Sequence, residues 1–111
     1  MDSIQQPSLA QSLRHFRDIA EHAEAAERLL KSLANRHRLA ILCLLKDQEL
    51  SVSQLNTYIP LSQSALSQHL AWLRQENCVE TRRDSQTIYY RLVDGKVKSV
   101  IDTLYVLFCQ E

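Results

Sequence analysis

Short hydroxyl and amide side chains are concentrated at the start of one predicted helix, and none of them is acidic. Glutamine can pair bidentately with adenine in the major groove of DNA, and serine can contact bases or phosphate. A helix N-terminus adds free N–H groups and the positive end of a dipole, which favour phosphate. The pattern indicates a DNA-reading surface, with an ordinary solvated helix surface as the alternative. The candidate residues are Ser62, Gln63, Ser64, Ser67 and Gln68.

A basic hairpin is predicted after this helix and could contact the same DNA. Arg82 and Arg83 stand close to Gln86 and Thr87 at its tip. Basic side chains on such a hairpin can reach phosphates or the adjacent minor groove. His69 borders the apolar stripe of the preceding helix, and we expect it to pack or to touch phosphate and not to bind a metal.

Local signals predict the elements that position these residues. Asn35 can cap a helix that runs to about residue 46; it is apolar almost all round, so we expect a central buried helix. Ser51 and Gln54 form a capping box for a third helix, which Pro60 ends. Two segments rich in β-formers, 79–83 and 87–92, predict a hairpin. The remaining predicted helices cover residues 9–33, 62–77 and 94–110.

These elements predict a single domain over residues 1–111, mainly α with a β-hairpin, in the order α-α-α-α-β-β-α. The order is typical of a winged helix–turn–helix. The recognition helix is expected at about 62–77 and the wing at about 79–92, while residues 1–8 are expected to be disordered. Apolar residues at helical spacing should hold the recognition helix in place, namely Leu66, Leu70 and Leu73.

Composition narrows the functional classes. The single glycine excludes a glycine-rich phosphate loop, and no nucleophile, base and orienting group stand at a recognisable spacing, so an enzyme is not expected. The net charge is zero, yet residues 28–91 hold nine Lys/Arg against five acidic side chains, which makes the middle of the chain basic. The absence of a long apolar run and of a secretory signal predicts a cytoplasmic protein without a membrane segment.

Three segments resemble the ArsR/SmtB family of repressors: residues 33–42 (LANRHRLAIL), 62–70 (SQSALSQHL) and 87–92 (TIYYRL). The resemblance spans about residues 28–110. It implies a homodimer, paired through helices at about 9–33 and 94–110, on double-stranded DNA with a two-fold symmetric operator. Many members of the family have a glycine in the wing, whereas Asp84-Ser85-Gln86 contains none.

Most repressors of this kind leave DNA when a metal or an oxidant binds, but the metal sites of the family are not retained here. Ser51 and Ser53 stand where one site has a pair of cysteines, and hydroxyls are poor ligands for soft metals. A cluster of His15, His22 and a thiol has no recognised spacing. The site on the last helix keeps only its aspartate among the matching positions Asp94, Lys96, Leu107 and Gln110.

Cys43 and Cys109, 66 residues apart, match the subgroup of the family that senses reactive sulfur species or oxidants through two thiols. The resemblance implies that the inducer joins the thiols by a disulfide or a longer polysulfide bridge, without a cofactor, and that DNA affinity falls. A thiolate can attack a persulfide sulfur and a second thiol can resolve the product. A buried cysteine that serves as a small apolar residue is the alternative, and Cys78 is expected to be a bystander. A metal-responsive repressor and a virulence-gene anti-repressor stay open as other functions.

Overall fold

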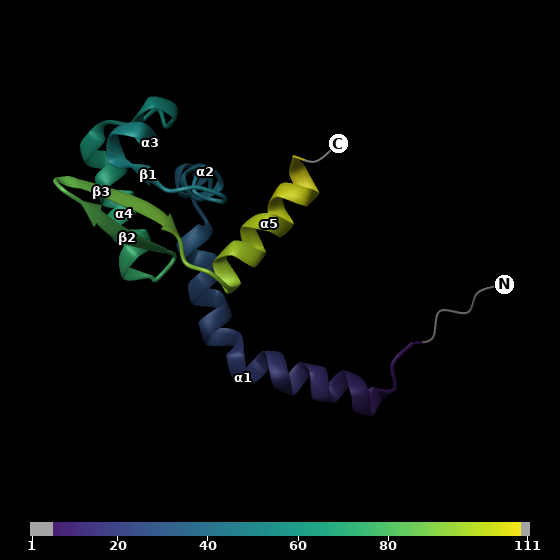
Figure 1. Ribbon diagram of the computed structural model, residues 1–111. Coiled ribbons are helices and arrows are strands. Elements are labelled where there is room, and N and C mark those ends of the chain that lie inside the picture. The colour runs from purple at the N-terminus through teal and green to yellow at the C-terminus, as the bar shows by residue number, and fades with distance from the viewer. Residues whose placement is uncertain (1–5, 110–111) are drawn as a thin grey trace.

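The computed structural model describes residues 6–109 and has the predicted winged helix–turn–helix architecture (Figure 1). The prediction for residues 1–8 falls partly outside this range, and residues 6–8 are exposed and precede the first helix. The elements are α1 (Leu9–Leu33), α2 (Arg36–Leu44), β1 (Leu50–Ser51), α3 (Val52–Tyr58), α4 (Gln63–Gln75), β2 (Val79–Asp84), β3 (Thr87–Leu92) and α5 (Lys96–Phe108).

Polar side chains begin four of the five described helices, because the first N–H groups of a helix have no partner inside it. The Ser51 hydroxyl accepts from the Gln54 N–H while the Gln54 side chain accepts from the Ser51 N–H, so the predicted capping box is confirmed. Asn35 caps α2 by accepting from two backbone N–H groups, also as predicted. Ser8 and Ser62 cap α1 and α4 in the same way.

The core lies between α2, α3, α4, the sheet and the first half of α5. Its leucines and isoleucines repeat at helical spacing and are almost fully removed from water, which supplies the main stabilisation of the fold. The expectation that α2 is buried almost all round is wrong: Ile41 and Leu42 are buried, but Arg36, Ala40 and Cys43 are exposed. The largest fully buried apolar side chains are Ile41, Leu42, Leu45, Leu55, Leu66, Leu70, Leu73 and Ile101.

Most of α1 does not pack on this core. Every residue from 9 to 25 is exposed, and Figure 1 shows the N-terminal half of the helix turning away from the domain. The radius of gyration is 17.9 Å, against about 13 Å for a compact domain of this length. The apolar stripe that predicted this helix therefore faces solvent in the single chain.

The sheet has three strands in the order β1-β3-β2, all antiparallel. The sequence analysis missed β1, which has two residues and pairs Leu50 with Tyr90. In the wing, Asp84 pairs with Thr87, so the hairpin closes through two residues. Ser85 takes the left-handed conformation (φ 58°) that a glycine would adopt without strain.

The recognition helix ends two residues earlier than predicted. Asn77 has a φ of 60°, and its N–H donates to the Arg74 carbonyl while the Cys78 N–H donates to the Leu73 carbonyl. This pair of bonds is a Schellman motif, in which asparagine replaces the usual glycine. The motif turns the chain sharply from α4 into β2, and Cys78 becomes a buried apolar residue at that turn.

Candidate functional site

The two faces of α4 divide as the sequence predicts. Leu66, Leu70 and Leu73 are fully buried and attach the helix to the core. The side chains that could reach a base edge are exposed and lie toward the N-terminal end of the helix, where the positive end of its dipole favours phosphate. They are Gln63, Ser64, Ser67 and Gln68, with Ser62 at the cap.

Side-chain hydrogen bonds fix the turn between α3 and α4. The Asn56 amide donates to the carbonyl oxygens of Leu61 at 2.8 Å and Ile59 at 3.4 Å, on both sides of Pro60. The Ser62 hydroxyl accepts from the Ala65 N–H and lies 3.3 Å from the Ser64 hydroxyl. The turn therefore presents the start of α4 in one orientation. Sequence reasoning missed Asn56, since nothing local distinguishes it from a solvated asparagine.

His69 is half-buried and faces α2. Its ring centroid is 6.2 Å from that of His37. Burial lowers the pKa of His69, and the positive charge of Arg38 and the proximity of His37 lower it further. These contacts agree with the packing role expected for His69, while its predicted contact with phosphate stays a prediction.

The arginines of the wing differ in how freely they can reach a ligand. Arg82 donates to the Glu49 carboxylate at 2.7 Å and lies over the Tyr89 ring at 4.9 Å. Arg91 pairs with Glu80 at 3.0 Å. Arg83 forms no ion pair within residues 6–109 and is exposed, as are Gln86 and Thr87 at the tip.

An ion pair connects the long helix α1 to the end of the recognition helix. The Arg28 guanidinium donates to both oxygens of Glu76, at 2.8 and 3.3 Å, and the Ser32 hydroxyl lies 3.5 Å from the same carboxylate. The Glu76 side chain is only 7% exposed. Hydrogen bonding from Arg28 lowers the pKa of Glu76 and keeps it ionised. The partners are 48 positions apart in the sequence, which explains why sequence reasoning missed this contact.

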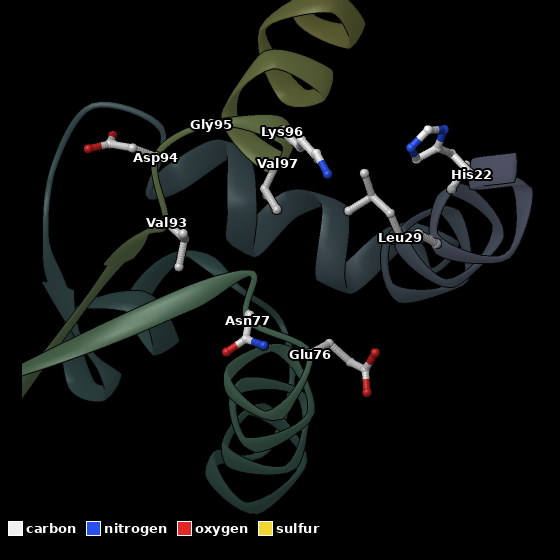
Figure 2. A pocket seen from close by; sticks show the side chains of 11 residues that line it. His22, Leu29, Glu76, Asn77, Val93, Asp94, Gly95, Lys96 and Val97 are labelled. Atoms are coloured by element: carbon white, nitrogen blue, oxygen red, sulfur yellow. The ribbon is translucent and has the colours of Figure 1, made fainter. Parts of the chain in front are cut away.

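A largely apolar cavity of about 790 Å³ lies beside this ion pair, between α1, the turn after α4 and the start of α5. Figure 2 shows Leu29 and Val97 lining its middle, whereas Asp94 points away from His22. Asp94 is the one ligand type retained from the family site on the last helix. No group of three metal-ligating side chains is found in the part of the chain that the structure describes. Gln110, another position that matches the family site on the last helix, lies outside that part.

Two of the three thiols, Cys43 and Cys109, are exposed. Cys43 lies on α2 and Cys109 is the C-cap of α5; both are free thiols. Burial of the sulfur raises the pKa of Cys43 first, and the charge of Cys109 raises it further, while Lys46 opposes both. The helices that carry the two thiols contact each other through Lys46, which lies 3.3 Å from Asp102 and 5.1 Å from the centre of the Tyr105 ring. Cys78, by contrast, is fully buried, and its thiol donates to the Glu76 carbonyl at 3.8 Å.

None of the helices within residues 6–109 is both long and apolar enough to cross a membrane.

Comparison with known proteins places the chain among bacterial regulators. The family described as "Bacterial regulatory protein, arsR family" matches residues 35–81. The transcriptional activator HlyU of Vibrio cholerae is 46% identical over 104 residues, which are 94% of this chain and 96% of that protein. The biofilm growth-associated repressor of Xylella fastidiosa is 38% identical over 94 residues, 85% of this chain and 82% of that protein.

Solved structures agree with this placement. Reduced HlyU from Vibrio cholerae superimposes with a TM-score of 0.80 at 49% identity, over 85% of this chain and 99% of that chain. The repressor BigR from Xylella fastidiosa superimposes with a TM-score of 0.79 at 38% identity, over 86% of this chain and 97% of that chain. These relatives are transcriptional regulators and not enzymes, in agreement with the sequence prediction. The chain therefore belongs to the ArsR family of bacterial transcriptional regulators.

Proposed function

We propose that this regulator is a repressor that senses reactive sulfur species or oxidants through Cys43 and Cys109 and releases its operator when the pair is bridged. The observation that carries the proposal is the contact between the two helices that hold these thiols, since Lys46 next to α2 reaches Asp102 and Tyr105 on α5. Both thiols are exposed and can meet an inducer. One solved relative is described as reduced HlyU, so the redox state of that relative was a defined property of its structure. This description supports the proposal that redox state also matters here.

The chemistry needs only a persulfide as co-reactant. One thiolate attacks the outer sulfur of glutathione persulfide, forms a protein persulfide and displaces glutathione thiolate. The second thiolate attacks the sulfur bonded to the protein and displaces hydrosulfide, which leaves a disulfide. Two protein thiols are oxidised, and the persulfide is reduced to glutathione and hydrogen sulfide. Insertion of further sulfur atoms from additional persulfide would give a longer bridge.

A bridge at this place can alter DNA binding because it joins two parts of the molecule. α2 belongs to the core that carries the recognition helix, whereas the side chains at the far end of α5, residues 105–109, are exposed. If the protein exchanges between two arrangements of α5 and α2, a bridge between them would favour one arrangement. DNA affinity would then change provided that the two arrangements bind DNA with different affinities.

A homodimer on a two-fold symmetric operator is part of the proposal. Large apolar side chains are exposed along α1 and at the end of α5, with Phe16 64% and Phe108 80% exposed. Contiguous apolar surface of this kind marks an interface. Two copies would present two recognition helices to the two halves of the operator. We expect the bases of each half to be read by Gln63, Ser64, Ser67 and Gln68.

The test is operator binding before and after exposure to glutathione persulfide. The probe is a fluorescent duplex that the reduced protein selects from a random-sequence pool. Wild type should lose affinity by at least about tenfold, which corresponds to about 1.4 kcal/mol. Cys109→Ser and Cys43→Ser should bind the duplex when reduced but not respond. Cys78→Ala is the matched control and should respond like wild type, since its thiol is buried.

Unchanged affinity of the treated wild type would overturn the proposal, and so would a normal response of Cys109→Ser. Intact mass identifies the product, because a disulfide removes two hydrogen atoms and a polysulfide adds sulfur atoms. Titration of Zn(II) onto the reduced protein tests the metal-responsive alternative, which predicts a loss of affinity without any mass change.

A second candidate function is supported by the name of one relative. HlyU of Vibrio cholerae is called an activator, whereas its Xylella counterpart is called a repressor. This chain could therefore raise transcription by displacing another DNA-binding protein. A template transcribed with and without a competing nucleoid protein separates the two functions: a repressor lowers transcription on both templates, and an anti-repressor raises it only where the competitor is bound.

A further inference from the structure

Lys46 stands where α2 meets the last helix, and its surroundings are unusual for a surface lysine. Its ammonium lies 3.3 Å from Asp102, 3.4 Å from Asp47 and 5.1 Å from the centre of the Tyr105 ring. The side chain is only 24% exposed. Lys98 contacts the same two carboxylates, at 3.6 and 3.7 Å, so four charges of alternating sign form a closed cluster.

The carboxylate of Asp102 lies between two lysines, and Lys46 is the nearer of them. Its Oδ1 atom is buried and accepts no directed hydrogen bond within the described residues, so the ammonium of Lys46 is its nearest compensation. A buried carboxylate oxygen without a partner is costly. Asp102 therefore holds the Lys46 ammonium against α5, where the face of the Tyr105 ring adds a cation–π contact.

The same two faces carry the thiols of the proposed switch. Lys46 follows Cys43 by three residues, and its N–H donates to the Cys43 carbonyl at 3.2 Å. On α5, Asp102, Tyr105 and Cys109 are spaced by three and four residues, which places them on one side of the helix. The Lys46 charge also acts on the thiol of Cys43, whose pKa it lowers against the larger effects of burial and of Cys109.

We propose that Lys46 is the positioning residue of the Cys43–Cys109 pair: through Asp102 and Tyr105 it holds the cysteine-bearing face of α5 against α2, and it places a positive charge three residues from Cys43. The inference rests on the proposed function, because positioning matters only if the two thiols are joined. Its first test does not need the bridge.

The first test measures the rate at which iodoacetamide alkylates Cys43 in a protein that carries Cys109→Ser and Cys78→Ala. Adding Lys46→Met should slow alkylation by about threefold at low salt, because fewer Cys43 thiols are ionised. The difference should shrink in about 1 M KCl, where charges are screened over about 3 Å. Lys46→Arg keeps the charge and should restore the rate.

Lys98→Met is the matched control. It removes the other lysine of the same cluster, but Lys98 is not among the charges that act on Cys43. The Lys98→Met variant should therefore be alkylated at the same rate as its parent protein. Equal rates for Lys46→Met and its parent at low salt overturn the proposal, and so does an equal slowing by Lys46→Met and Lys98→Met. Thermal unfolding followed by circular dichroism verifies that each variant is folded.

The second test measures how fast persulfide-treated protein with all three cysteines loses Cys43 and Cys109 to a bridge. Lys46→Met should slow bridging by about tenfold, because the second thiol is held less closely. Unchanged bridging overturns the proposal. If wild type does not bridge at all, the proposed function fails, whereas the effect of Lys46 on Cys43 alkylation is judged by the first test alone.

Discussion

At the scale of single residues, the proposed DNA surface contains side chains with two kinds of task. Gln63 is exposed at the start of α4, where an amide can reach a base edge. Arg83 is exposed on the wing and forms no ion pair within residues 6–109, so it is free to neutralise a phosphate. Base contacts give specificity, and phosphate contacts give affinity and salt dependence.

Substitution of these two residues should therefore have different effects. Gln63→Ala should reduce the preference for the selected duplex over a mutated one by about 1–3 kcal/mol. Arg83→Ala should weaken binding to all sequences and lower the salt slope by about one per protomer. Fluorescence anisotropy at several salt concentrations measures both quantities. If both variants lose the same specificity and the same slope, the assignment of the two roles is wrong.

Arg82 has a different environment, which leads to a prediction about pH. Hydrogen bonding from Arg82 lowers the pKa of Glu49 below its ordinary value of 4.5. A carboxylate with a lowered folded pKa stabilises the fold above its ordinary pKa, and this contribution is lost as the pH falls through the folded value. The melting temperature should therefore fall below pH 4.5, and it should fall less steeply in Glu49→Gln. Parallel curves for the two proteins between pH 3 and 6 would contradict this.

At the scale of elements, the wing closes through a residue in a strained conformation. A left-handed residue other than glycine costs about 1–2 kcal/mol, and glycine costs about 0.5–1 kcal/mol in lost chain entropy. Ser85→Gly should therefore stabilise the protein by about 0.5–1 kcal/mol. Gln86→Gly is the matched control: Gln86 does not have a positive φ, so the change should destabilise. Urea unfolding measures both, and stabilisation by both variants would refute the explanation.

The C-terminal end of α4 is linked to α1 by an ion pair. The Schellman motif at Asn77 ends the helix, and Glu76 at the same end pairs with Arg28 of α1. A shift of α1 would therefore act on the recognition helix through its last turn. α4 also contacts α2, because His69 lies beside His37 and Arg38 lies over the Trp72 ring.

At the scale of the whole molecule, the long α1 exposes its apolar stripe in the single chain, and the proposed dimer would cover it. Phe16 lies in the middle of that stripe, and Arg14 lies on the opposite side of the helix because each residue turns it by about 100°. Phe16→Glu should give monomers in sedimentation velocity and weaken operator binding by about 100-fold, since the gain from two linked sites is lost. Arg14→Glu introduces the same side chain and should leave a dimer. A dimeric Phe16→Glu protein would show that α1 is not the interface.

The sequence alone determined most of the elements and the two faces of the recognition helix. Helix starts were predictable because capping is local: Asn35, Ser51 and Ser62 bond within three residues of themselves. The inward stripe of α4 was predictable because burial follows the helical repeat. The pairing of Cys43 with Cys109 is a prediction from the family resemblance and not from any local pattern.

Only the tertiary structure decided which polar groups find each other across long separations. Arg82 looked like a free cation of the wing until Glu49, 33 residues away, was found beside it. Cys43 stands in an apolar helix but is exposed. Lys46 meets Asp102 only because α2 and α5 pack together. Such contacts depend on how elements dock, and docking is set by the whole core, so no window of sequence contains them.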